Sequence, residues 1–82
     1  MAPIANFYRL KQEIARQRHL PIDTYISEAR NALINLRDNG PIPRQDFSTS
    51  IEDRGVNAIL VQSLLQKYRL AIIKRGYWWL ID

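Results

Sequence analysis

The last dozen residues constrain the fold most strongly, because they combine two apolar runs with a tight, charged turn. Residues 70–73 and 77–81 are rich in β-branched and aromatic side chains, and they flank Lys74-Arg75-Gly76. Two such runs joined by a tight turn containing glycine predict a β-hairpin. A helical pattern ends directly before it, at about Tyr68. The chain is therefore expected to end in a helix that leads straight into a hairpin with a cationic tip.

Both faces of this predicted hairpin are apolar. A two-residue turn at Arg75-Gly76 would place Ile73 opposite Trp78. Because side chains alternate along a strand, the two faces carry Leu70, Ile72, Trp79 and Ile81 on one side and Ala71, Ile73, Trp78 and Leu80 on the other. A two-layer domain covers only one of them, so something must cover the second. The candidates are the amphipathic N-terminal segment and a partner, most simply a second copy.

Two longer helices are predicted before the middle of the chain. Apolar residues recur at helical spacing over about residues 3–18, and Pro21 then breaks the pattern. Residues 22–39 carry the clearest one-sided apolar stripe, which ends at Gly40-Pro41. Ile42, between two prolines, is expected to be extended and to form one short edge strand.

Two further helices are predicted between that strand and the hairpin. The third is expected to begin at Pro43 or Arg44 and to last about two turns, with Phe47 and Ile51 pointing inward. A turn follows over residues 52–55. The fourth helix is predicted over residues 56–68, with an apolar stripe that includes Ile59.

Length and composition limit the class of protein. At 82 residues, with 46% apolar residues, the chain is expected to be one small globular domain. It has no cysteine, no signal-peptide pattern and no apolar run long enough to span a bilayer, so a cytoplasmic protein without a membrane partner is expected. The net charge of +4 suits a polyanionic partner such as nucleic acid.

From about Tyr25 to Ile81, the order of elements resembles the winged helix-turn-helix superfamily. The segment Gly40-Pro41-Ile42-Pro43-Arg44-Gln45-Asp46-Phe47 is similar to the passage from helix 1 to helix 2 in many bacterial winged-helix regulators. The resemblance implies a mainly α (α+β) fold, with a C-terminal β-hairpin wing. Residues 22–82 would form the winged-helix domain, and residues 1–20 an additional N-terminal amphipathic helix, either an extension or a dimer arm.

In that family the third helix of the unit lies in the major groove of double-stranded DNA. Carried onto this chain, helix 56–68 would read bases, and the residues offered to DNA there would be Arg54, Asn57, Ala58 and Gln62. The hairpin tip, Lys74 and Arg75, would contact phosphate. Arg44 would meet a phosphate at the start of the short helix, helped by the helix's N-terminal amides.

The resemblance therefore implies a small double-stranded DNA-binding protein, a transcriptional regulator or an accessory DNA-binding factor that acts as a dimer. The alternative is a winged helix used for protein–protein contact through the apolar hairpin face. Glu52 and Asp53 favour this alternative, because acidic residues near a phosphate backbone are unfavourable. The residues expected at such an interface, or between two copies, are Phe7, Ile73, Trp78 and Leu80.

The sequence offers little for catalysis. His19 is the only histidine, there is no cysteine, and no phosphate-binding loop, paired-histidine metal site or serine elbow is present. We expect no enzyme activity, no cofactor and no metal. Tyr77, Trp78 and Trp79 could stack on single-stranded bases, but their aliphatic neighbours favour core packing.

Overall fold

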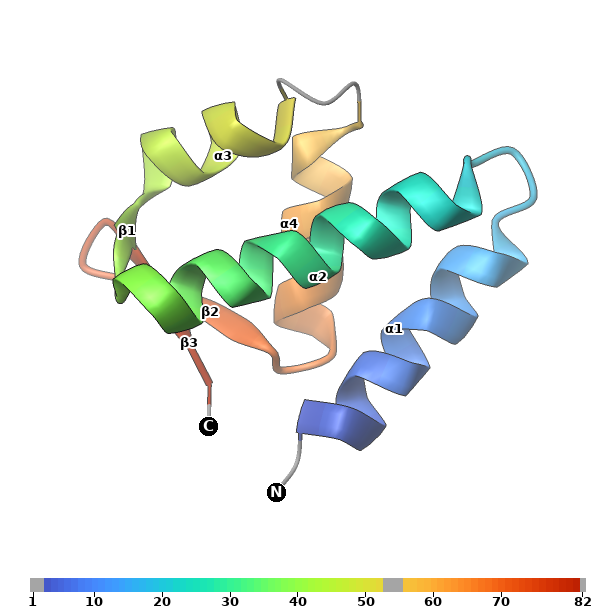
Figure 1. Cartoon of the computed structure of the whole chain (residues 1–82), viewed down its shortest axis with the longest axis horizontal. Coiled ribbons are helices and arrows are strands. Elements are labelled where there is room, and N and C mark those ends of the chain that lie inside the picture. Colours follow the sequence, from blue (N-terminus) through green and yellow to red (C-terminus); the bar gives the residue numbers. More distant parts are fainter. Residues whose placement is uncertain (1–2, 53–55, 82) are drawn as a thin grey trace.

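The computed structural model describes residues 3–52 and 56–81, which form a mainly helical α+β fold (Figure 1). In chain order the elements are α1 (Pro3–Arg16), α2 (Ile22–Asn39), β1 (Ile42–Pro43), α3 (Arg44–Glu52), α4 (Ala58–Lys67), β2 (Ala71–Lys74) and β3 (Tyr77–Leu80). The predicted order of four helices, a short strand and a hairpin is confirmed. The predicted turn over residues 52–55 lies mostly outside the described residues.

The C-terminal hairpin has the predicted register. Ile73 pairs with Trp78 and Ile72 pairs with Trp79 across the antiparallel strands β2 and β3. Arg75 and Gly76 both have positive φ, +56° and +80°, as a two-residue turn that follows the twist of the strands requires. On its other edge β3 pairs with β1, so the sheet order is β1-β3-β2.

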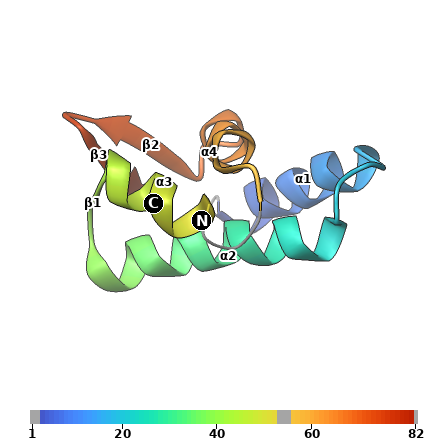
Figure 2. The same cartoon turned by 90° about the horizontal axis from the view of Figure 1, so that it is seen from above.

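The helices cover one face of this small sheet. Figure 2 shows α2 along one side of the molecule, with the hairpin and α4 on the other side. Trp78 of β3 is fully buried and stacks on Phe47 of α3, with ring centroids 4.9 Å apart. Large aromatic side chains bury more apolar area per residue than most others, so this pair lies at the centre of the core.

α1 is part of the same core. Its residues Leu10 and Ile14 are almost completely buried and belong to the one cluster that also contains the apolar side chains of α2, α4 and the hairpin. α1 packs against α2 and is held to the end of α4 by hydrogen bonds from Lys67 and Tyr68 to Glu13. The N-terminal helix is therefore not a detached arm.

The outward face of the hairpin is not covered by the N-terminal helix, the first of the two predicted covers. Ile72 and Trp79 remain 39% and 41% exposed. The face that carries Trp78 is the one turned to the core, whereas the prediction assigned Trp78, with Ile73 and Leu80, to a face that a partner would cover. The periodicity of a hairpin with two apolar faces defines two sides, but it does not say which side is buried.

The ends of two helices differ slightly from the prediction. α1 ends at Arg16 rather than Arg18, and the amide of Gln17 donates to the carbonyl of Ile14 in a closing turn. α4 begins at Ala58 because Asn57 is its N-cap, and the Asn57 side chain accepts a hydrogen bond from the amide of Leu60.

α4 ends in a Schellman motif, which directs the chain into β2. The amide of Leu70 donates to the carbonyl of Leu65, and the amide of Arg69 donates to the carbonyl of Gln66. Arg69 has a φ of +56°, a left-handed conformation that glycine usually supplies at this position. Leu65 and Leu70 are both buried, so the hydrophobic contact that accompanies this motif lies in the core.

Candidate functional site

Three cations are gathered at the corner where α3 meets the hairpin turn. The amide of Arg44, the first residue of α3, donates to the carbonyl of Gly76 at 3.0 Å, which ties the start of the helix to the turn. Lys74 and Arg75 lie next to that carbonyl in sequence, and all three side chains are exposed. Within the described residues, no carboxylate forms an ion pair with any of them.

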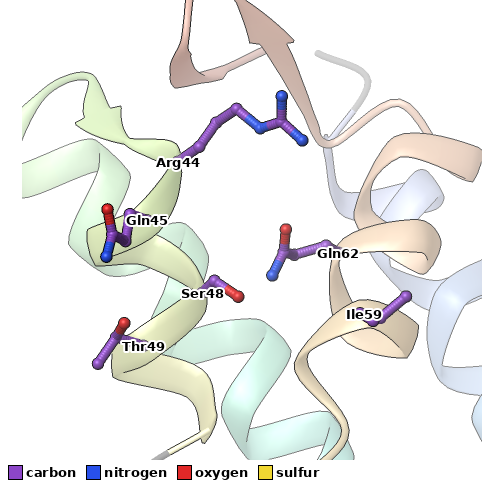
Figure 3. Close-up of a pocket in the computed structure, with 6 residues that line it drawn as sticks. All are labelled: Arg44, Gln45, Ser48, Thr49, Ile59 and Gln62. Atoms are coloured by element: carbon purple, nitrogen blue, oxygen red, sulfur yellow. The ribbon is translucent and has the colours of Figure 1, made fainter.

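A groove between α3 and α4 begins beside this corner. Five of its six lining residues have polar side chains; the lining consists of Arg44, Gln45, Ser48, Thr49, Ile59 and Gln62. In Figure 3, Gln62 projects from α4 toward Ser48 on α3, and Arg44 extends from the start of α3 toward the hairpin. The groove is thus lined by uncharged hydrogen-bonding side chains along its length, and its end at Arg44 is positively charged.

The outward face of α4 is polar but carries little charge. Ile59, Ser63 and Gln66 are exposed and Gln62 is half-buried, whereas Ala58, Val61, Leu64 and Leu65 face the core. The single charged residue of α4 is Lys67 in its last turn, and its ammonium group lies 3.3 Å from Glu13. Amides, a hydroxyl and one aliphatic side chain therefore make up the surface that α4 offers to a partner.

Four of the seven residues predicted to contact DNA lie at this site. Arg44, Lys74 and Arg75 form the cationic corner, and Gln62 lines the groove. The Arg44 amide is already bonded to Gly76, so it is not free to help bind a phosphate as predicted. Arg54, a fifth predicted contact, lies outside the described residues.

Of the other two predicted base contacts, Ala58 is wrong, and Asn57 has its side-chain oxygen engaged in a helix cap. Ala58 is 2% exposed and packs in the core. The side-chain oxygen of Asn57 caps α4, and its backbone amide donates to the hydroxyl of Tyr25 at 2.9 Å. Pairing this side chain with adenine through both its oxygen and its nitrogen would break the cap. The prediction failed because it began the helix at residue 56 and took the cap residue Asn57 and the buried Ala58 for residues of its outward face.

Sequence reasoning missed Ile59, Ser63 and Gln66 as surface candidates. Ile59 was assigned to the apolar stripe, yet its side chain is 77% exposed. The signal was present in the spacing, because Ile59, Gln62, Ser63 and Gln66 follow one another at three- and four-residue intervals on a single helical face. An isoleucine within the apolar-rich sequence of α4 hid this pattern.

The predicted interface residues do not form an exposed cluster. Trp78 is fully buried, which makes its assignment to an interface wrong, and Ile73 and Leu80 are half-buried against the core. Phe7 lies under the guanidinium group of Arg30, 5.5 Å from its ring centroid. The exposed apolar residues of the hairpin are instead Ile72, Tyr77 and Trp79. The indole nitrogen of Trp79 donates to the carbonyl of Lys74.

The strongest electrostatic cluster of the described residues lies away from this groove, around Glu13. Its carboxylate accepts hydrogen bonds from the hydroxyl of Tyr68 at 2.7 Å and from the ammonium group of Lys67 at 3.3 Å. The Tyr68 bond and then the Lys67 bond lower the pKa of Glu13 from 4.5 to about 2. The same contact raises the pKa of Tyr68 above its usual value. This cluster joins α1 to α4 and is structural.

The described residues contain no group of three or more histidine, cysteine or acidic side chains that could hold a metal ion. Among the helices described, none has the length and apolarity needed to cross a membrane. Comparisons with protein-family models, with curated proteins and with solved structures found no match for the chain. The features of the described residues that bear on function are therefore the groove, the cationic corner and the outward face of α4.

Proposed function

We propose that the chain is a winged-helix protein that binds double-stranded DNA, in transcriptional control or as an accessory factor. In this proposal α4 enters the major groove, α3 lies across the backbone, and the hairpin is a short wing that contacts phosphate. The major groove is wide enough to admit a helix. The observation that carries the proposal is the hydrogen bond between Arg44 and Gly76, because it unites the cations of two elements at one end of the groove.

The distribution of charge supports this orientation. The cations of the corner, which form no ion pair with a carboxylate of residues 3–52 or 56–81, lie beside a helix whose outward face is nearly uncharged, so phosphates and base edges would meet different residues. Phosphate contacts position a protein on DNA, and base contacts specify the sequence. The hairpin turn consists only of Arg75 and Gly76. A wing this short can touch the phosphates of DNA but cannot reach far into a groove, so the bases would be read by α4.

The test is an anisotropy titration of the full chain with a labelled pool of random-sequence duplexes, repeated at several salt concentrations. We expect binding at about 50 mM salt that weakens steeply toward 200 mM as counterions are released. Arg75→Asn should lower the slope of log K against log salt by about 0.9, since one phosphate contact is lost. Asparagine tolerates the left-handed conformation of residue 75, so the turn is kept.

Arg18→Asn is the matched control, because it makes the same substitution and the same change in net charge. Arg18 is exposed in the connection between α1 and α2, which lies at the opposite end of the molecule from the hairpin turn (Figure 1). This variant should keep the slope of the unmodified chain. Equal effects of the two substitutions would place the contact elsewhere, and absence of binding to any duplex at low salt would reject DNA binding.

A second candidate is self-association through the outward face of the hairpin, favoured by the exposure of Ile72, Tyr77 and Trp79. β2 is an edge strand of the sheet, so a second copy could pair with it. Sedimentation of the isolated chain tests this: a dimer that Trp79→Ser converts to a monomer supports it. Trp79 is the appropriate site, because replacing the buried Trp78 would unfold the core. A monomer at high concentration rejects it.

A further inference from the structure

The outward face of α4 contains one strongly exposed aliphatic residue. Ile59 is 77% exposed, more than any other large apolar residue described, and it stands among Gln62, Ser63 and Gln66. Exposure of an isolated aliphatic side chain is common, but its position here is specific. It shares one helical face with two glutamines, beside a groove whose far wall ends at Arg44.

These side chains differ in which base edges they can recognise. Adenine offers an acceptor and a donor in the major groove, which match the amide of glutamine, whereas guanine offers two acceptors, which match arginine. The methyl group of thymine is an apolar surface that an aliphatic side chain can contact. The outward face of α4 has two amides, one aliphatic group and no cation before the last turn.

The outward face of α4, from Ile59 to Gln66, is long enough to contact a few successive base pairs of DNA. Ile59 and Gln66 are seven positions apart, which corresponds to about 10 Å along a helix. Base pairs are stacked about 3.4 Å apart, so this face spans roughly three of them.

We propose that α4 makes the chain selective for A·T base pairs, with Gln62 and Gln66 pairing with adenines and Ile59 contacting a thymine methyl group. The inference rests on the proposed function and adds to it the kind of DNA sequence that the chain prefers. The cationic corner supplies affinity for any duplex, and the uncharged face of α4 supplies the preference. Substitutions at the two places therefore have different effects.

Selection of bound sequences from a random duplex pool with the full chain gives the first test, and enrichment of adjacent A·T pairs is expected. The selected duplex is then made in two altered forms. Uracil in place of thymine removes only the methyl group, and 7-deazaadenine removes only the N7 acceptor of adenine. We expect affinity to fall about fourfold per contacted methyl and roughly tenfold per contacted adenine.

Variants connect each loss to its residue. The affinity of Ile59→Ala should no longer depend on the uracil substitution, and that of Gln66→Ala or Gln62→Ala should no longer depend on 7-deazaadenine at one position. Because Ile59 and Gln66 are exposed, their variants should unfold at the same denaturant concentration as the unmodified chain, which separates recognition from folding. Glutamine variants that keep full sensitivity to 7-deazaadenine would overturn the assignment.

The results also separate this inference from the proposed function. Binding that depends on salt and on Arg75 but is equal for A·T-rich and G·C-rich duplexes would overturn the inference alone. Enrichment of G·C pairs in the selection would do the same. Failure of every duplex to bind at low salt would overturn both.

Discussion

At the scale of single residues, Arg69 holds a conformation that its side chain does not favour. It closes the Schellman motif after α4 with a φ of +56°. A left-handed conformation costs a residue with a Cβ about 1–2 kcal/mol, a cost that glycine avoids. Replacing Arg69 with glycine should therefore raise the free energy of unfolding by roughly 1 kcal/mol, measured by urea denaturation.

Arg69→Ala is the informative control, because it removes the same charge and the same long side chain but keeps the Cβ. It should give no comparable gain. A gain as large for alanine as for glycine would mean that the backbone conformation is not the source of the effect.

At the scale of elements, the carboxylate of Glu13 fastens α1 to the end of α4. Its pKa of about 2 in the folded protein lies below the usual 4.5, so it stabilises the fold above about pH 4.5. That contribution is lost as the pH falls from 4.5 toward 2. Glu13→Gln should therefore lower the urea midpoint at pH 7, and the difference from the unmodified chain should shrink steadily below pH 4.5.

Arg16→Ala serves as the control for this prediction. Arg16 also contacts Glu13, at 3.1 Å, but its side chain is 71% exposed, and exposed ion pairs contribute little. It should leave the urea midpoint nearly unchanged at both ends of the pH range. A Glu13→Gln variant that matched the unmodified chain at pH 7 would show that the carboxylate charge does not hold these helices together.

The elements themselves were largely predictable from the sequence, because their signals are local. The apolar stripe of α2, the break at Gly40-Pro41 and the Arg75-Gly76 turn each depend on neighbouring residues. The start of α4 at Ala58 depends on the side-chain cap from Asn57, whereas the sequence pattern began the helix at residue 56 and counted the buried Ala58 as exposed. Which side of the hairpin is buried depends on how the helices pack, and this is not encoded in the alternation of its apolar residues.

At the scale of the whole molecule, all four described helices contribute to one hydrophobic core. Leu10 of α1 is fully buried, so Leu10→Ala should lower the free energy of unfolding by about 2–5 kcal/mol. Tyr8→Ala, two positions earlier and 59% exposed, should change it by less than about 0.5 kcal/mol. Thermal or urea unfolding compares them. A small effect of Leu10→Ala would mean that α1 is dispensable to the fold.

The neighbouring residues Trp78 and Trp79 lie on opposite faces of β3, one sealed in the core and one half open to solvent. Their fluorescence should therefore report on different events, although they are adjacent in the chain. An added quencher reaches the exposed Trp79 first, so the emission that it quenches is that of Trp79. The emission that stays protected is that of Trp78, which packs on Phe47. A ligand that covers the hairpin would shield the first signal, and unfolding would expose the second. The chain thus carries an intrinsic optical probe that distinguishes occupancy of its surface from loss of its interior.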